Sequence, residues 1–128
     1  MMYNYSSGSY YEGDIVDGSF TGKGKFYFYN GDIYDGEFCE DKFHGFGKYV
    51  YKSGDTYTGY FENDEFHGIG TYIFKCDVKE KGKYHKGKRV GKFVYLENEV
   101  YSIVLYNNDV ISFSETTDPV NVSVEKLP

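Results

Sequence analysis

The sequence predicts an all-β fold, an elongated single-layer antiparallel β-meander of stacked hairpins with no helices. The first observation is a short phrase, tyrosine followed two residues later by glycine, that recurs every 23 residues at Tyr11, Tyr34 and Tyr57. The second is that each copy continues with a Gly-x-Gly and then an aromatic-x-aromatic pair. The third is an aromatic content of 21%, which favours strands. A period this short is typical of repeat architectures, in which each unit packs on its neighbours.

Alternation along the chain assigns the two faces of each hairpin. In the second repeat it puts Tyr34, Gly36 and Phe38 on one face of a first strand. It puts four further residues on one face of a second strand: Gly45, Gly47, Tyr49 and Tyr51. The polar stretch 39–44 between them is expected to be a turn. A second turn is expected where glycine supplies the positive φ of a tight hairpin, at Ser7-Gly8, Asn30-Gly31 and Ser53-Gly54.

The register between hairpins is predicted from the cost of glycine in strands. Glycine destabilises a strand unless a neighbouring group uses the space of its missing side chain. An aromatic ring laid across the glycine does so, and each strand glycine is therefore expected opposite an aromatic residue. The expected pairs are Phe26–Gly36, Tyr49–Gly59 and Tyr72–Gly82, with Phe38 over Gly24 and Phe61 over Gly47 in return.

The repeat boundaries follow from the same period. The sheet is expected over 1–106, with a half repeat at 1–10 and repeats at 11–33, 34–56, 57–79 and 80–100. In the fourth repeat Glu80 replaces the tyrosine, and 91–95 copies 47–51 two residues early, which predicts a repeat shortened by two residues. A fifth unit begins at Tyr101 with Ile103 where glycine belongs. We expect a degenerate cap at 101–113 and an extended or disordered tail at 114–128.

The full pattern, Y-x-G-x-[F/Y] followed by G-x-G-x-[F/Y]-x-[F/Y]-x-x-G, resembles the MORN (membrane occupation and recognition nexus) repeat. The resemblance covers 1–106 and is most specific from Tyr11 to Phe74. It implies an elongated, twisted single-layer sheet of the kind found in proteins that scaffold, dimerise or attach to membranes and cytoskeleton. The family pattern carries no catalytic residues. We therefore expect no enzyme and no cofactor, but a scaffold or interaction module.

Histidines and cysteines are weak candidates for chemistry. His44 and His67 occupy the same point of neighbouring repeats, about 10 Å apart by two strand spacings. Zinc–nitrogen bonds are ~2.0–2.1 Å long, so these histidines cannot share an ion and no metal site is expected. By the same spacing, Cys39 and Cys76 are expected to be free thiols. The Gly-x-Gly lies within a strand and not between strand and helix, which excludes a dinucleotide site.

Charge and hydropathy narrow the class of partner. The net charge of −6 argues against nucleic acid as a partner. The sequence has no apolar run long enough to span a bilayer and no signal-peptide segment, so the cytoplasm is the expected location. There, the resemblance implies association with the cytoskeleton or the inner membrane face.

The exposed part of the aromatic stripe is the candidate site for a partner protein segment. A one-layer sheet cannot bury all of its rings, and tyrosine is favoured at interfaces. The alternative is that the rings bury one another completely. The candidate groove residues are Tyr11, Phe26, Phe28, Tyr34, Tyr49, Tyr51, Tyr57, Tyr72 and Phe74.

Two further surfaces are candidates for binding. A basic cluster in the fourth repeat matches the chemistry of an anionic phospholipid headgroup, although it equally suits a solvated strand whose lysines deter edge pairing. Its members are Lys81, Lys83, Lys86, Lys88, Arg89 and Lys92. An open meander also leaves an edge strand at each end, where a homodimer can form. The short apolar stretch 103–106 is expected to be either such a seam, tested at Leu105, or a cap.

Overall fold

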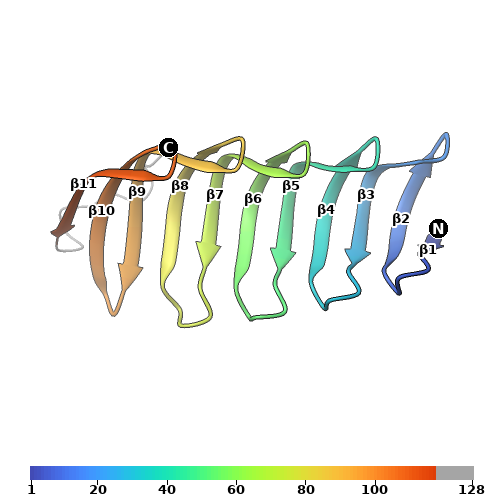
Figure 1. Cartoon of the computed structure of the whole chain (residues 1–128), viewed down its shortest axis with the longest axis horizontal. Coiled ribbons are helices and arrows are strands. Elements are labelled where there is room, and N and C mark those ends of the chain that lie inside the picture. The colour runs from blue at the N-terminus through green and yellow to red at the C-terminus, as the bar shows by residue number, and fades with distance from the viewer. Residues whose placement is uncertain (118–128) are drawn as a thin grey trace.

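The computed structural model describes residues 1–117, apart from the side chains of 113 and 115–117. These residues form one open sheet in which every strand pairs with its neighbours in sequence, all antiparallel (Figure 1). Within the described residues there is no helix, and the predicted fold class is confirmed. The strands are β1 (Met2–Asn4), β2 (Tyr10–Val16), β3 (Ser19–Tyr27), β4 (Ile33–Cys39), β5 (Lys42–Val50), β6 (Thr56–Glu62), β7 (Glu65–Ile73), β8 (Lys79–His85), β9 (Lys88–Glu97), β10 (Val100–Asn107) and β11 (Val110–Thr117).

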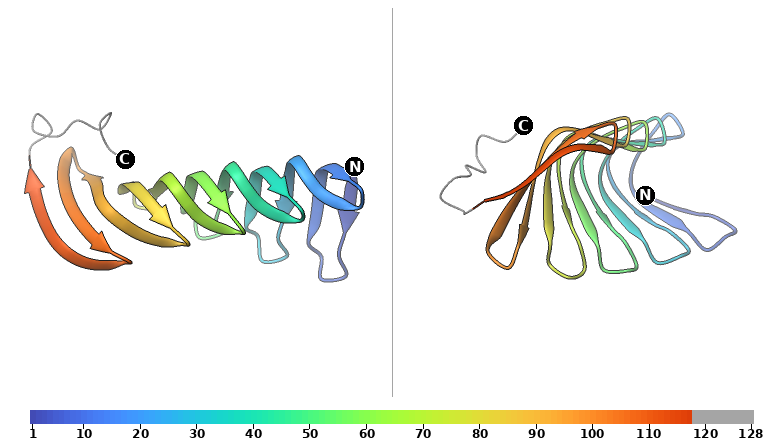
Figure 2. Two further views of the ribbon diagram at one scale, coloured as in Figure 1. Left: turned by 90° about the horizontal axis from the view of Figure 1, so that it is seen from above. Right: turned by 60° about the vertical axis from the view of Figure 1, so that its left-hand side comes forward.

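Each hairpin is bent along its length, and all hairpins curve to the same side (Figure 2). The bend coincides with a bulge in each of the first four hairpins, for example where the pairing of β4 with β5 shifts between Gly36 and Phe38. A bulge bends a strand and increases its twist. Stacked side by side, the bent hairpins form a trough along the long axis of the molecule.

The hairpin tips are two-residue turns with both residues at positive φ, such as Glu40 at 48° and Asp41 at 71°. Turns of this type match the twist of the flanking strands. The predicted turn over 39–44 was therefore too long, since β4 continues to Cys39 and β5 begins at Lys42. Phe43 consequently belongs to a strand.

An aspartate at the tip ties the second, third and fifth hairpins each to the hairpin before it, whereas the fourth hairpin has Gly87 at this point. Asp41 accepts a 2.8 Å hydrogen bond from the Phe20 N–H through its side chain, and its own N–H donates to the Phe20 carbonyl. Asp64 makes the same two contacts with Phe43. These bonds continue the ladder between hairpins out to their tips.

The connections between hairpins are wider and follow the prediction. Gly31 and Gly54 have φ values of 102° and 106°, which an L-residue rarely adopts. Asp32 links the first of these connections to the next one by accepting from the Lys52 N–H and the Tyr49 hydroxyl, each at 2.8 Å.

The register between hairpins differs from the prediction by two residues. Phe26 lies opposite Tyr34, Tyr49 opposite Tyr57 and Tyr72 opposite Glu80. Phe38 lies opposite Gly22 and Phe61 opposite Gly45. Glycine instead faces glycine, in the pairs Gly24–Gly36, Gly47–Gly59 and Gly70–Gly82.

The paired glycines make room for the tyrosine that opens each repeat. Tyr34 lies along its own strand, and its hydroxyl donates a 2.7 Å hydrogen bond to the Glu37 carbonyl. A Cβ atom at Gly47 would lie 2.7 Å from Cε1 of that ring. A ring does cover the glycines, as predicted, but it belongs to the opening tyrosine of the hairpin and not to the residue across the strand.

A phenylalanine in the second strand completes this unit. The rings of Tyr34 and Phe43 stack with centroids 3.9 Å apart at an interplanar angle of 10°. Tyr11–Phe20 and Tyr57–Phe66 repeat the stack at 3.8 and 3.7 Å. The core is thus one face of the sheet, built from repeated Tyr–Phe stacks over a row of glycines.

The fourth hairpin is not shortened, contrary to the prediction, and only the connection that follows it is one residue shorter than in the earlier repeats. Glu80 lies opposite Tyr95, and Tyr84 lies opposite Arg89, which continues the period of 23 residues. Phe93 therefore occupies the place of the second glycine, and its ring covers Gly82. The ring that is missing at Glu80 is supplied from the other strand.

The fifth hairpin is shifted by one residue from its predicted start at Tyr101. A tight turn at Asn98-Glu99 puts Ser102 opposite Tyr95, so that Val104 and Tyr106 face the core. The predicted seam at 103–106 is wrong, because β10 pairs with both β9 and β11. Of the predicted tail 114–128, residues 114–117 belong to β11 and 118–128 lie outside the described residues.

Candidate functional site

Three of the predicted groove residues are excluded from contact with a partner. Tyr11, Tyr34 and Tyr57 are 0% exposed, because each is enclosed by its glycines and its stacked phenylalanine. The other six are half-buried on the same face: Phe26, Phe28, Tyr49, Tyr51, Tyr72 and Phe74. Self-burial and an exposed groove therefore both occur, on different residues.

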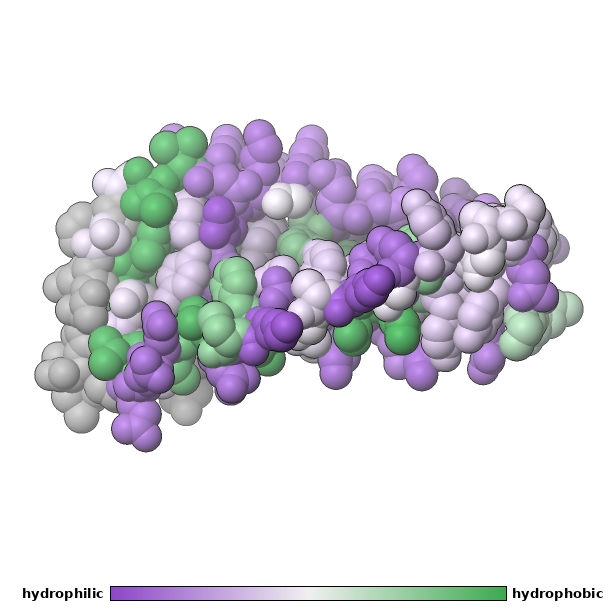
Figure 3. All heavy atoms as spheres, turned by 60° about the horizontal axis from the view of Figure 1, so that its bottom comes forward, coloured by the Kyte–Doolittle hydropathy of each residue, from purple (hydrophilic) through white to green (hydrophobic). Residues whose placement is uncertain are grey.

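The half-buried rings form a continuous zigzag along the sheet, which we call the aromatic ladder. The two rings that each hairpin contributes lie closest, one at the end of a strand and one just beyond it, with centroids 4.6 Å apart for Tyr49–Tyr51. Rings of successive hairpins are 5.8 Å apart, as in Phe28–Tyr49 and Tyr51–Tyr72. The ladder consists of Tyr3, Tyr5, Phe26, Phe28, Tyr49, Tyr51, Tyr72 and Phe74. Figure 3 shows hydrophilic side chains along both long sides of the molecule, with hydrophobic ones between them.

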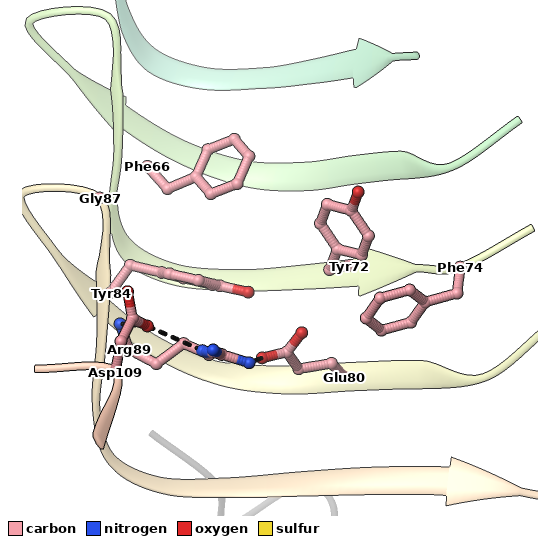
Figure 4. Close-up of a pocket in the computed structure, with 8 residues that line it drawn as sticks. All are labelled: Phe66, Tyr72, Phe74, Glu80, Tyr84, Gly87, Arg89 and Asp109. Carbon is pink, nitrogen blue, oxygen red and sulfur yellow. Dashed lines mark hydrogen bonds and ion pairs between the residues drawn. The ribbon is translucent and has the colours of Figure 1, made fainter. Parts of the chain in front are cut away.

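Among the hollows that open on this face beside the ladder, two are built from equivalent residues, and another of about 440 Å³ adjoins the first of them at Tyr5, Phe20 and Asp41. The amino-terminal hollow, about 410 Å³, is lined by Tyr5, Phe20, Phe26, Phe28, Phe38, Asp41, Phe43 and Asp64. The carboxy-terminal hollow, about 260 Å³, is lined by Phe66, Tyr72, Phe74, Glu80, Tyr84, Gly87, Arg89 and Asp109 (Figure 4). Both contain rings of the ladder, a stacked-pair residue and a turn aspartate.

The two hollows are the same pocket, two repeats apart. Phe20, Phe26, Phe28 and Phe38 correspond to Phe66, Tyr72, Phe74 and Tyr84, each 46 residues later. Asp64 corresponds to Asp109, since each accepts from the backbone of the preceding hairpin at an equivalent point. The main differences are that Arg89 replaces Phe43 and Gly87 replaces Asp41.

Arg89 holds two carboxylates on either side of its guanidinium group (Figure 4). Its Nε donates to Asp109 Oδ1 at 2.8 Å, and Nη1 lies 3.2 Å from Glu80 Oε1. Burial raises the pKa of Glu80, although the Tyr95 hydroxyl and the Arg89 charge act against it. Burial alone raises the pKa of Asp109 too, but the hydrogen bonds from Arg89 outweigh it and lower that pKa.

Tyr95 and Tyr106 complete this polar cluster. Arg89 Nη1 donates to both hydroxyls at 3.2 Å, and the two hydroxyls hydrogen-bond each other. The Tyr95 hydroxyl also donates to Glu80 at 2.9 Å. The Arg89 carbon Cζ lies 4.4 Å from the centroid of the Tyr106 ring, within cation–π range. Arg89 is therefore part of the core-face network and is excluded from the predicted lipid-binding cluster.

The lysines of that cluster lie on the face opposite the aromatic ladder or at a hairpin tip. Strand alternation places Lys81 and Lys83 on that face of β8, and Lys88 and Lys92 on that face of β9. Lys86 is a tip residue with φ of 50°. Among the side chains that the structure describes, no carboxylate oxygen lies within 4.0 Å of any of these five ammonium groups.

Among the histidines and cysteines, His67 has a structural role. His67 binds Glu62 at 3.0 Å through Nε2, and its Nδ1 accepts from the Lys86 N–H at 3.2 Å. Cys39 and Cys76 are free and exposed. In the part of the chain that the structure describes, no three His, Cys, Asp or Glu side chains gather as metal ligands. The same part contains no helix able to cross a bilayer.

A family model of the MORN repeat matches residues 11–33, 34–56 and 57–75 in succession. The chain therefore belongs to the MORN-repeat family, as its sequence pattern indicated. No curated protein matches this chain. The three matched segments contain the Tyr–Phe stacks and most of the aromatic ladder, whereas the Glu80–Arg89 pair lies beyond them.

Two features of the site were missed in the sequence, although a signal for each was present. Phe20, Phe43 and Phe66 recur at the period of 23 residues, but Phe43 falls in the predicted turn and Phe20 and Phe66 have no predicted place. Asp41 and Asp64 also recur, each two residues before its phenylalanine. The correspondence of Arg89 with these phenylalanines was hidden by the repeated motif at 91–95, which suggested a deletion.

Proposed function

We propose that this chain is a non-catalytic scaffold or interaction module whose trough binds an extended segment of a partner protein. The assembly that it serves is cytoskeletal or membrane-proximal and lies in the cytoplasm, in keeping with the repeat family. The observation that carries the proposal is the aromatic ladder, a row of half-exposed rings held in place by fully buried ones.

The packing beneath the ladder explains why such rings suit binding. Ordering a flexible side chain at an interface costs about 0.5–1.5 kcal/mol. Tyr49 is already fixed, since its ring lies 6.1 Å from Phe43 and its hydroxyl donates to Asp32. Tyr72 is fixed in the same way by Asp55 at 2.7 Å. Rigid aromatic residues with a polar tip are the usual anchors of protein interfaces.

Selection from a displayed library of random peptides tests this proposal. Peptides that bind the parent chain should bind Tyr51→Ser at least about tenfold more weakly, because an aromatic anchor contributes 2 kcal/mol or more. The matched control is Tyr60→Ser, since Tyr60 is 50% exposed on the opposite face of the sheet. Equal losses in the two variants, or selected peptides insensitive to Tyr51, would contradict the trough as the binding surface.

The alternative function is a peripheral phospholipid-binding module that uses the lysine cluster. The supporting observation is that Lys81, Lys83, Lys88 and Lys92 share one face, where a lysine near an anionic membrane contributes about 1 kcal/mol. Co-sedimentation with vesicles of phosphatidylcholine and phosphatidylserine tests it against Lys83→Glu with Lys88→Glu. Binding that survives this double reversal rules out the lipid role.

A further inference from the structure

We propose that the amino-terminal hollow recognises the cationic side chains of a basic segment in polyproline II conformation, with arginine or lysine at every third residue. This inference rests on the proposed function and names the chemistry of the segment. It is carried by the comparison of the two hollows, one of which already contains a guanidinium group from the chain itself.

The carboxy-terminal hollow shows how this pocket accommodates a cation. Arg89 binds the turn aspartate Asp109 at 2.8 Å while its guanidinium lies against the Tyr106 ring. At the equivalent point of the amino-terminal hollow stands Phe43, which cannot bind the turn aspartate Asp64 in this way. The amino-terminal hollow is also the larger, at about 410 against 260 Å³. It keeps the carboxylate and lacks the cation.

Two carboxylates of this hollow are without a positive partner. Asp41 and Asp64 each use Oδ1 to accept a backbone N–H, which leaves Oδ2 to accept from a ligand. Among the described residues, no nitrogen of Lys, Arg or His lies within 4.0 Å of either carboxylate. Residues 1–75 contain twelve carboxylates and six lysines, and so account for the whole net charge of −6. The charge of this half complements a basic ligand and attracts it.

The spacing of the two aspartates selects the conformation of the ligand. They occupy the tips of neighbouring hairpins, which two strand spacings of ~4.8 Å set about 10 Å apart. A polyproline II helix rises ~3.1 Å per residue with three residues per turn, so that every third side chain points the same way about 9 Å further on. A β-strand puts residues three apart on opposite faces. A segment along the trough therefore meets both carboxylates best as polyproline II.

The lining of the hollow suits the rest of such a segment. Phe28 and Phe43, 6.1 Å apart and edge to face, line the hollow beside the two aspartates. Aromatic-lined grooves bind proline-rich polyproline II segments, which are extended before they bind. A guanidinium or ammonium group next to these rings also gains a cation–π attraction.

Fluorescence anisotropy with a labelled peptide that repeats Pro-Pro-Arg tests the inference on the full chain. Comparison peptides repeat Pro-Pro-Gln, or Pro-Arg, in which the arginines fall at every second residue. The decisive variant is the double change Asp41→Asn, Asp64→Asn, since asparagine tolerates positive φ and its Oδ1 still accepts the backbone N–H. The control is Glu12→Gln, Asp35→Asn, which removes the same charge from the opposite face.

We expect saturable binding of the Pro-Pro-Arg peptide and about tenfold weaker binding by the Asp41, Asp64 variant, from the loss of two ion pairs. The control should bind within about twofold of the parent. If the variant and the control lose the same affinity, the effect is due to net charge alone and the inference is overturned. Equal affinity for Pro-Pro-Gln would show that the ligand needs no cation, and equal affinity for Pro-Arg would show that the spacing of its cations does not matter. Either result overturns the inference and leaves the proposal of a segment-binding trough unaffected. If the Pro-Pro-Arg peptide does not bind, this inference is overturned but the proposed function is not, since the peptide selection tests the trough independently.

Discussion

Glu80 and Arg89 occupy the two positions that hold a stacked tyrosine and phenylalanine in each of the first three hairpins. The ion pair between them, 3.2 Å from Nη1 to Oε1, therefore replaces an aromatic stack such as Tyr34–Phe43 at 3.9 Å. Phe93 compensates for the lost ring by covering Gly82 from the neighbouring strand. Three exchanges act together: Glu80 and Arg89 replace the two stacked rings, and Phe93 replaces a glycine.

This relationship predicts that the fourth repeat can be transplanted into the second. Gly47→Phe alone should destabilise the chain by more than about 3 kcal/mol, because the new ring meets Tyr34. Adding Tyr34→Glu and Phe43→Arg recreates the Glu80, Arg89 and Phe93 set beside Asp64, which corresponds to Asp109. The triple variant should be more stable than the sum of the separate losses by at least about 1 kcal/mol. Urea unfolding of the parent, of Gly47→Phe, of the Tyr34→Glu, Phe43→Arg variant and of the triple variant measures this coupling. Strictly additive losses would show that Gly47 is independent of the other two positions.

A smaller change tests the packing of tyrosine on glycine. Gly47→Ala should cost about 1–3 kcal/mol, because its Cβ would lie 2.7 Å from Cε1 and Cζ of the buried Tyr34 ring. The control is Lys48→Ala, one residue along on the opposite exposed face, which should cost less than about 0.5 kcal/mol. If urea melts give equal losses for the two variants, the ring does not fill the glycine space.

The buried tyrosines predict that stability falls in alkali. Burial raises the pKa of Tyr34 and Tyr57 above the ordinary value of 10.0. The folded chain therefore keeps protons that the unfolded chain releases, so these groups stabilise the fold fully below about pH 10 and lose that effect as pH rises further. Urea midpoints measured from about pH 8 to pH 12 should decline above pH 10. Tyr34→Phe removes one such group, and a decline as steep as in the parent would exclude Tyr34 from the effect.

The ends of the sheet predict self-association. β1 and β11 are the outer strands of the sheet that residues 1–117 form, and open edges favour pairing with a second copy. We expect concentration-dependent dimers in sedimentation of the parent chain, weakened by Asn4→Lys, because charge on an edge strand deters pairing. Leu105→Lys serves as the control, since β10 has neighbours on both sides. A parent chain that stays monomeric at high micromolar concentration would eliminate a homodimer through either edge.

Much of this fold could be predicted because the repeat fixes both period and strand alternation. The faces of Tyr34, Gly36 and Phe38 followed from position alone, and so did the turns at Gly31 and Gly54. The register between hairpins could not be predicted, because the sequence indicates that a ring covers each strand glycine but not which residue supplies that ring. The answer depends on the Tyr34 hydroxyl, whose bond to the Glu37 carbonyl lays the ring along its own strand.

The site was predictable in kind but not in its members. Strand alternation alone cannot separate Tyr34, fully enclosed, from Tyr49, half-exposed on the same face, because the difference arises from stacking on Phe43. Arg89 was assigned to a surface cluster because it stands among lysines in the sequence. Arg89 lies on the core face because it pairs across the hairpin with Tyr84, and no local sequence pattern reveals that pairing.

Amide chemical-shift mapping of the labelled chain, titrated with its tightest selected peptide, tests the trough most directly. The largest shifts should fall on Phe28, Tyr49, Tyr51 and Tyr72, the centre of the aromatic ladder. Amides on the opposite face at Phe46 and Tyr60, whose rings contact each other at 5.5 Å, should stay unchanged. Shifts concentrated on that opposite face, or confined to the edge strands β1 and β11, would contradict a segment-binding trough.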